Sequence, residues 1–177
     1  MNVYPIEAGN FKLDGGAMFG VVPKSLWTKT NPADADNMIE MSSRCMLVEN
    51  SDKLILVDTG MGDKQSEKFF KHYKRWGSDN LVKSINSAGF SIDDVTDVLL
   101  THLHFDHCGG AVAWDSSKEA YDVLFKNANY WSNEKHWGWA TNPNPREKAS
   151  FLDENLFPIK ESGQLKFISN MSKGFKY

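Results

Sequence analysis

The stretch that decides the fold of this chain is Thr101-His102-Leu103-His104-Phe105-Asp106-His107, which directly follows an apolar segment, Val95 to Leu100. That segment predicts a short buried strand. Residues two apart point to the same side of an extended backbone, so we expect His102, His104 and Asp106 to converge just beyond the strand end. Imidazole nitrogens and a carboxylate are ligands that suit zinc, iron or manganese. This histidine motif (residues 101–107) therefore predicts a metal site.

The residues next to this cluster refine the prediction. His107 is adjacent to Asp106 and is expected to point elsewhere, so that two diverging pairs of ligands hold two metals a few ångströms apart. Cys108 is expected to be a small buried residue, because a thiolate would replace a histidine rather than join a full ligand set. The alternative is a group of surface histidines in a loop. It is disfavoured because polar groups gathered after a buried strand are costly unless they bind something.

The rest of the chain predicts an alternation of short strands and helices, without an internal repeat or a low-complexity tract. Besides Val95–Leu100, strands are expected at Phe11–Val22 (two short strands joined at Asp14-Gly15-Gly16), Cys45–Val48 and Leu54–Val57 (a hairpin), Tyr121–Trp131 and Leu165–Ile168. Helices are expected at Lys64–Trp76, Leu81–Ala88, Ser132–Trp139 and Arg146–Leu156. Apolar residues recur in them at three- and four-residue spacing, and Pro158 is expected to stop the last one.

Composition and charge exclude several classes of protein. With 41% hydrophobic and 24% charged residues, all 177 residues are expected to form one domain. A net charge of -3 supplies no positive field for nucleic acid. No segment approaches the roughly 18 consecutive apolar residues of a membrane span, and the N-terminus lacks the pattern of a secretory signal. Cys45 and Cys108 are expected to be free thiols, and the cytoplasm is the expected compartment.

The histidine motif, with Leu56-Val57-Asp58-Thr59-Gly60 upstream of it, resembles the metallo-β-lactamase-fold metallohydrolases. Two further stretches narrow the resemblance, Asp14 to Lys24 and Asn144 to Phe151. They are similar to the branch that contains quorum-quenching N-acyl-homoserine lactonases and methyl parathion hydrolases. The resemblance implies an α/β (α+β) fold, an αββα sandwich of which this chain supplies mainly the N-terminal half.

The resemblance also implies a division of labour among the ligands. His102 and His104 belong to a first divalent metal and Asp106 and His107 to a second, with zinc expected for both. Asp58 is expected to accept a hydrogen bond from a ligand histidine, or else to be only a turn-forming residue. Enzymes of this fold add a third histidine, a bridging carboxylate and a last histidine downstream of the motif. No such set follows here, so we expect a domain that lacks its C-terminal part.

The function that the resemblance implies is metal-dependent hydrolysis, with the lactone ring of N-acyl-homoserine lactones as the expected substrate. A hydroxide between two metals would attack the carbonyl carbon, and Asp106, unless it is a ligand only, would pass a proton to the departing ring oxygen. Hydrolysis of an organophosphate or another ester on the same metals is the first alternative. The second is an inactive fragment that binds a metal or a partner, including a second copy in a homodimer.

Candidate pocket residues lie outside the motif. Met18, Phe19 and Trp27 are expected to form an apolar wall for an acyl chain, with ordinary core packing as the alternative. His136 lies in the aromatic segment that the resembled family uses near its pocket. It is expected to be a pocket-wall or surface histidine, with metal ligation as the alternative.

Overall fold

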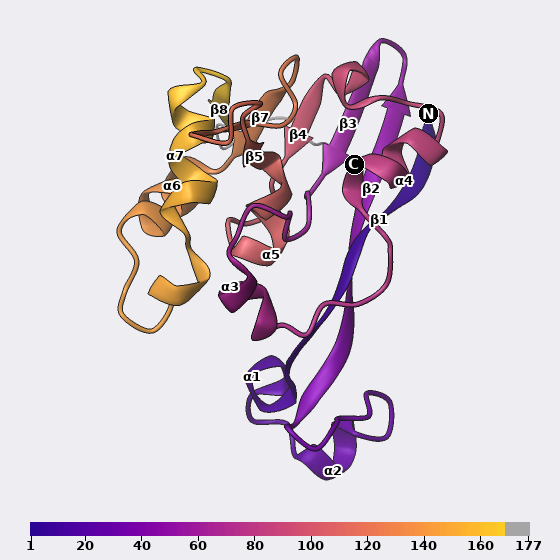
Figure 1. The fold of residues 1–177 in the computed structure, drawn as a ribbon, viewed down its shortest axis with the longest axis vertical. Helices are drawn as coiled ribbons and strands as arrows, with labels where there is room; N and C mark the ends of the chain where they lie inside the picture. Colours follow the sequence, from indigo (N-terminus) through magenta and orange to yellow (C-terminus); the bar gives the residue numbers. More distant parts are fainter. Residues whose placement is uncertain (169–177) are drawn as a thin grey trace, which may run out of the picture.

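The computed structural model describes residues 1–168 and centres on a six-stranded mixed sheet in the order β1-β2-β3-β4-β7-β8 (Figure 1). Its strands are β1 (Asn2–Asp14), β2 (Met38–Asn50), β3 (Lys53–Val57), β4 (Asp97–Leu99), β7 (Asn129–Ser132) and β8 (Leu165–Phe167). A separate hairpin pairs β5 (Val112–Trp114) with β6 (Tyr121–Val123). The helices are α1 (Gly15–Phe19), α2 (Lys24–Trp27), α3 (Glu67–Lys71), α4 (Leu81–Ser87), α5 (Phe105–Cys108), α6 (Glu134–Thr141) and α7 (Asp153–Glu161).

The direction of the strands places the motif. β1, β2 and β3 pair antiparallel, whereas β3, β4, β7 and β8 pair in parallel. The carboxyl ends of β3 and β4 therefore meet at one edge of the sheet. The backbone N–H of Asp58, just after β3, donates to the carbonyl of Leu99 at 2.9 Å. Thr101, at the start of the motif, follows β4 closely, so the motif and Asp58 lie side by side.

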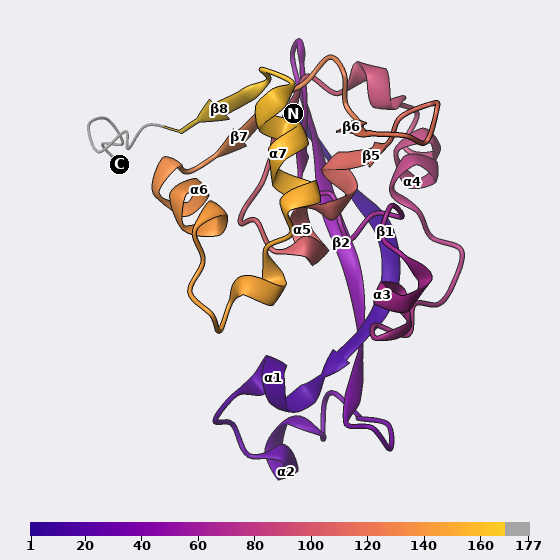
Figure 2. The same cartoon turned by 60° about the vertical axis from the view of Figure 1, so that its left-hand side comes forward.

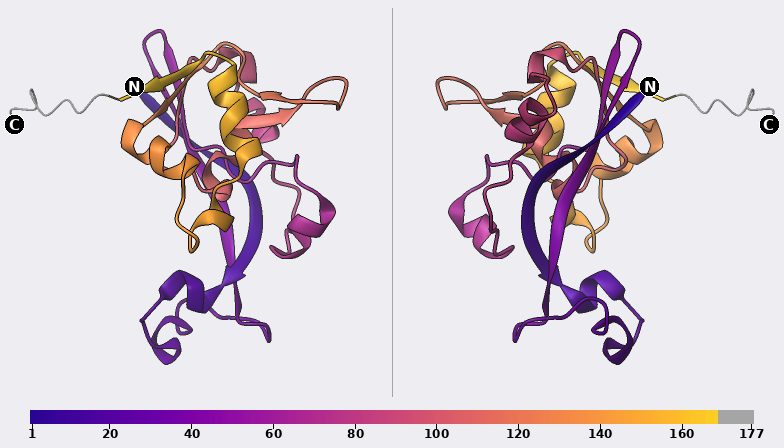
Figure 3. Two further views of the ribbon diagram at one scale, coloured as in Figure 1. Left: turned by 90° about the vertical axis from the view of Figure 1, so that its left-hand side faces the viewer. Right: turned by 90° about the vertical axis from the view of Figure 1, so that its right-hand side faces the viewer.

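One face of the sheet is covered. Helices α4 and α7 and the β5–β6 hairpin lie on this face in Figures 2 and 3. Their apolar residues share one core with alternate residues of the strands. Fully buried members of this core from the sheet are Ile6, Leu47, Leu56, Val98 and Tyr130. Alternation of this kind is what a sheet with one covered face requires.

The residues between them point to the opposite face, which is apolar and partly open. Along this face the register aligns Met46 with Val57 and Val57 with Leu99. Met46 is 42% exposed and Val3, near the chain start, is 53% exposed. A mixed sheet with helices on one face agrees with the α/β class expected from the sequence, and it leaves this open face as a surface for a second layer.

Several elements lie where the sequence predicts them. The β2–β3 hairpin, the strand before the motif, the helix that follows Asn133, and β8 are confirmed, although β2 is longer than expected. Helix α4 begins after Asn80, whose side chain accepts from the backbone N–H of Lys83. It ends before Gly89, which has φ 92° and so adopts the left-handed backbone that favours glycine.

The prediction of two short strands from Phe11 to Val22 is wrong. β1 starts at Asn2, and Asp14 ends it by capping α1: its carboxylate accepts the N–H of Ala17 at 2.7 Å. An aspartate before two glycines favours a turn, but the same side chain also begins helices. α1 and α2 consequently lie at the far end of the long β1–β2 ribbon (Figure 1).

The helix expected from Lys64 to Trp76 is much shorter than predicted. α3 spans only Glu67–Lys71, Lys74 has the non-helical φ of 41°, and Trp76 forms a β-bridge with Asn10. The strand expected from Tyr121 to Trp131 is two strands, β6 and β7, which belong to different sheets. A turn at Phe125 separates β6 from β7, and the N–H of Phe125 donates to the hydroxyl oxygen of Tyr130.

The helix expected from Arg146 to Leu156 is displaced toward the C-terminus. Residues 148–150 form only a 3₁₀ turn, and α7 runs from Asp153 to Glu161 with Pro158 inside it. Proline has no N–H to donate to the carbonyl of Glu154, so α7 lacks one helical hydrogen bond there and nevertheless continues through Pro158. Among residues 1–168, no helix combines the length and the apolar character that crossing a bilayer needs.

Candidate metal centre

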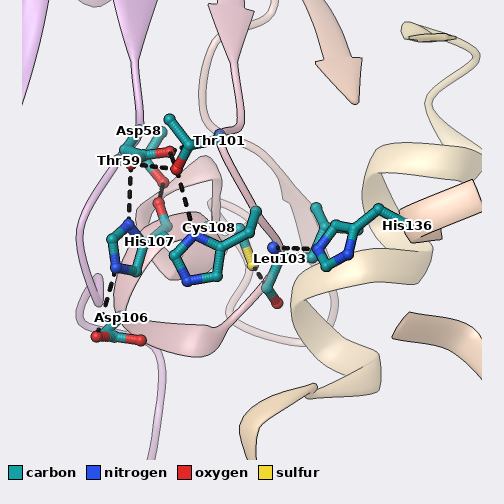
Figure 4. Close-up of polar contacts among 9 residues, drawn as sticks. Asp58, Thr59, Thr101, Leu103, Asp106, His107, Cys108 and His136 are labelled. Carbon is teal, nitrogen blue, oxygen red and sulfur yellow. Dashed lines mark hydrogen bonds and ion pairs between the residues drawn. The ribbon is translucent and has the colours of Figure 1, made fainter. Parts of the chain in front are cut away.

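The motif begins as irregular backbone after β4 and then enters α5, so its residues come from a loop and a helix. His104 precedes α5 with extended backbone (φ -66°, ψ 150°). The ring of Phe105 anchors α5 by packing 4.8 Å from Tyr73 and 5.4 Å from Phe69, centroid to centroid. Asp106 and His107 follow on the helix. This arrangement, and not an extended strand, sets the directions of the side chains, and Figure 4 shows Asp106 and His107 beside Asp58.

Three imidazole rings gather at this point. The ring centroids of His102 and His104 are 4.7 Å apart, and those of His102 and His107 are 3.9 Å apart. The expectation that His107 points elsewhere is wrong, because the helical turn at Phe105 brings its ring back beside His102. The spacing rule of an extended strand does not apply beyond His104.

Asp58 is the hydrogen-bonding centre of the cluster. Its Oδ2 lies 2.9 Å from Nδ1 of His107, and its Oδ1 accepts the backbone N–H of Thr101 at 2.9 Å. Burial alone would raise the pKa of Asp58, but the bonds from His107 and Thr101 hold it below its ordinary value. The ionised carboxylate therefore fixes the proton of His107 on Nδ1 and leaves Nε2 available to a metal.

Thr101 links Asp58 to His102 by hydrogen bonds and so fixes the tautomer of His102 as well. Its hydroxyl donates to Asp58, at 2.7 Å from Oδ2, and lies 3.2 Å from Nδ1 of His102. Because the hydroxyl proton is used, the oxygen accepts from Nδ1–H and Nε2 of His102 is left free. Burial and the neighbouring His107 lower the pKa of His102 to about 4, so this ring is neutral at pH 7. The motif sequence contains this threonine, yet nothing in its spacing assigns it a role.

Asp106 and His107 have the separation of two ligands of one ion. Oδ2 of Asp106 lies 3.7 Å from Nε2 of His107. Two donors about 2.1 Å from a tetrahedral ion are about 3.4 Å apart, so this pair fits a single divalent metal. Within residues 1–168, no group of three or more His, Cys, Asp or Glu side chains is arranged to hold a metal ion. The donor chemistry thus fits a metal, and the described residues supply part of its shell.

The loop after β3 lies in close backbone contact with Gly109 and Gly110, which follow the motif in the sequence. A Cβ on Gly109 would lie 2.2 Å from the carbonyl oxygen of Met61, and one on Gly110 would lie 2.2 Å from that of Thr59. Only glycine allows this approach. The buried Lys64 donates from Nζ to the carbonyl of Gly109 at 2.5 Å. The sequence pattern predicts Lys64 as the first residue of a helix and so misses this contact.

The expected pocket residues are divided between two places. Phe19 and Trp27 stack 5.0 Å apart on α1 and α2, where Trp27 covers Gly15, and Met18 is 45% exposed. The structure does not bring these three to the motif. His136 does lie at the motif, with its ring 6.5 Å from that of His102. Its Nε2 accepts the backbone N–H of Leu103 at 3.0 Å.

A cavity of about 120 Å³ adjoins Asp106 and His107. The strands that wall it contribute Phe11, Met41, Ser42, Ser43, Arg44 and Cys45. Among the described residues, its lining includes neither His136 nor the residues of α1 and α2. Cys45 and Cys108 are buried free cysteines, as the sequence predicts. Burial raises the pKa of Cys108 to about 12, and its Sγ donates to the carbonyl of Leu103 at 3.3 Å.

Several known proteins are similar to this chain in sequence or in fold. An N-acyl homoserine lactonase of Bacillus cereus is 28% identical over 104 residues, which are 53% of this chain and 40% of that protein. A probable metal-dependent hydrolase from Staphylococcus aureus superposes with a TM-score of 0.84 at 30% identity, covering 94% of this chain and 58% of the other. AidC, a dizinc quorum-quenching lactonase in complex with a product, superposes with a TM-score of 0.70 at 27% identity, covering 98% and 60%.

The chain spans less than two thirds of the length of each of these proteins. The sequence profile of the metallo-beta-lactamase superfamily matches residues 39–167, which include Asp58 and the whole motif. The six-stranded mixed sheet has the fold of the solved relatives over nearly all of this chain. By sequence and by fold, this chain belongs to the metallo-beta-lactamase superfamily.

Proposed function

We propose that this chain carries the N-terminal metal-binding part of a metal-dependent hydrolase that opens the ring of N-acyl-homoserine lactones. The observation that carries the proposal is the contact of Asp58 with His107, which leaves one ring nitrogen directed at the carboxylate of Asp106. Support for lactones comes from similarity to the Bacillus cereus lactonase and to the dizinc lactonase AidC.

In this proposal the motif holds two divalent ions, with zinc as the metal. His102 and His104 would bind the first ion, and Asp106 and His107 the second. Each pair supplies two donors, whereas a catalytic zinc keeps three protein ligands and one open position. Residues 169–177 contain no His, Cys, Asp or Glu. We therefore expect further donors from polypeptide outside this sequence, and we expect the chain by itself to be a slow hydrolase.

The residues of the chain have separate tasks in the reaction. A divalent ion, when bound, supplies hydroxide near neutral pH and polarises a carbonyl group. Asp58 keeps His107 in one tautomer, and through Thr101 it does the same for His102. The carboxylate of Asp106, with Oδ2 3.7 Å from Nε2 of His107, would carry a proton to the departing ring oxygen, which must leave as an alcohol.

Ring opening of N-hexanoyl-homoserine lactone tests the proposal. The zinc-loaded chain should open the lactone slowly, as followed by chromatography, and a chelator should abolish the activity. His107→Ala should lose it, whereas His72→Ala, which removes an exposed histidine outside the motif, should keep it. Activity that survives the chelator would contradict the proposal. Cleavage of a phosphotriester without any lactone opening would favour the organophosphate alternative.

A further inference from the structure

The backbone of Leu103 is held by side chains on both of its polar groups. Its N–H donates to Nε2 of His136 at 3.0 Å, and its carbonyl accepts from Sγ of Cys108 at 3.3 Å. Leu103 is fully buried, so an unbonded N–H at this point would be costly. It also lies between His102 and His104, in backbone that belongs to neither a strand nor a helix.

The hydrogen bond defines the state of His136. An imidazole nitrogen that accepts a bond carries no proton, so the proton of this ring lies on Nδ1. Protonation of Nε2 would break the bond to Leu103. The lone pair of Nε2 is therefore already used, which leaves this histidine without a free nitrogen for a metal.

The position of His136 is fixed by contacts other than its bond to Leu103. It lies in the first turn of α6, where the side chain of Asn133 accepts the N–H of His136 at 3.2 Å. The next residue, Trp137, is 6% exposed and is part of the main core. The ring of Phe151 packs 5.9 Å from His136 and 4.9 Å from His104. Helix α6 thus presents His136 as a rigid acceptor.

We propose that His136 is a positioning residue that sets the spacing of His102 and His104 by holding the N–H of Leu103. A shift of about one ångström in His102 or His104 would disrupt a metal site. Leu103 is adjacent to both histidines, so holding its backbone restricts both of them. The inference rests on the proposed function in one respect, which is that these two histidines bind a metal.

Two substitutions separate this role from metal ligation. His136→Gln keeps an acceptor on a side chain of similar reach, whereas His136→Met keeps the size and removes the strong acceptor. The first measurement is amide hydrogen exchange at Leu103, read by NMR in the zinc-free protein, and it does not depend on any activity. We expect exchange to rise at least about tenfold in His136→Met and to remain within about threefold of the parent in His136→Gln.

The second measurement is zinc affinity by competition with a coloured chelator. His136→Met should weaken it about tenfold and His136→Gln should restore it, with His72→Met as the unaffected control. If both variants lose zinc equally while the Leu103 amide stays protected, His136 is a ligand and the proposal is wrong. Unchanged exchange and unchanged affinity in His136→Met would also overturn it. A failure of lactone opening alone would count against the proposed function and not against this role.

Discussion

Asp58 and His107 lie 49 positions apart in the sequence and meet at 2.9 Å between Oδ2 and Nδ1. Asp58 has a backbone φ of 60°, a conformation that aspartate and asparagine tolerate better than most other residues. The turn after β3 therefore places this carboxylate under the motif, where it bonds both His107 and Thr101. A single residue outside the motif thus orients histidines assigned to both ions.

Replacement of this carboxylate tests its role. Asp58→Asn keeps the tolerated backbone conformation but loses the negative charge that holds the proton on Nδ1 of His107. We expect zinc affinity to fall about tenfold to hundredfold, as measured by competition with a chelator. Asp52→Asn, in the exposed turn between β2 and β3, is the control. Equal affinity of the two variants would show that Asp58 is only a turn residue.

Glycine at position 110 is required by the contact with the loop after β3. The Cβ of Gly110→Ala would lie 2.2 Å from the carbonyl oxygen of Thr59, so the backbone must shift. We expect the free energy of unfolding to fall by about 3 kcal/mol in a denaturant titration. Gly138→Ala, in α6 with open space around its Cβ, should instead raise it by about 0.5 to 1 kcal/mol. Similar effects of both changes would refute the close contact.

The buried Lys64 makes the free energy of unfolding depend on pH in the alkaline range. Burial lowers the pKa of its ammonium group from 10.5 to about 8. Between these two pH values the unfolded chain binds a proton that the folded chain has released, so the free energy of unfolding rises with pH. Across this window the parent should gain about 3 kcal/mol relative to Lys64→Met. Denaturant titrations at several pH values measure the difference, and the exposed Lys68→Met is the control. A flat difference would contradict a buried ammonium.

The open face of the sheet predicts self-association. In a solution of the purified chain, a second copy is the one polypeptide that can cover the apolar rows containing Met46, Val57 and Leu99. Light scattering should show mass that rises with concentration. Met46→Lys should weaken association, whereas Met18→Lys, at a similarly exposed position on α1, should not. A monomer at all concentrations would contradict this prediction. It would mean that burying this face does not stabilise a dimer, although burial of apolar surface usually contributes about 25 cal/mol per Å².

The sequence predicted the elements whose residues carry strong local patterns. The apolar runs in β2 and β3 and the cap residues of α4 can be read from the sequence itself. β1 was missed from Asn2 to Asn10 because only Ile6 and Phe11 of the whole strand are buried, so it has no clear alternation. Its pairing with β2 is a long-range contact that local propensity does not encode.

The site was predictable in its chemistry and less so in its geometry. The histidines and Asp106 are candidates because of the motif itself, whereas the role expected of Asp58 came only from the resemblance to the metallo-β-lactamase fold. The direction of His107 depends on where α5 begins, which the spacing of the motif residues does not reveal. Phe19 and Trp27 are apolar enough to line a pocket, but in the structure they pack on each other. Apolar character alone does not separate these two uses.

The most direct test of the account is the zinc content of the purified chain, measured by elemental analysis after free metal has been removed. Because the described residues offer no group of three donors, we expect fewer than two zinc ions per chain. The double variant His102→Ala/His104→Ala should reduce that content, whereas the exposed His72→Ala should not change it. Two tightly held zinc ions per chain that persist in the double variant would contradict the assignment of the metal site to this motif.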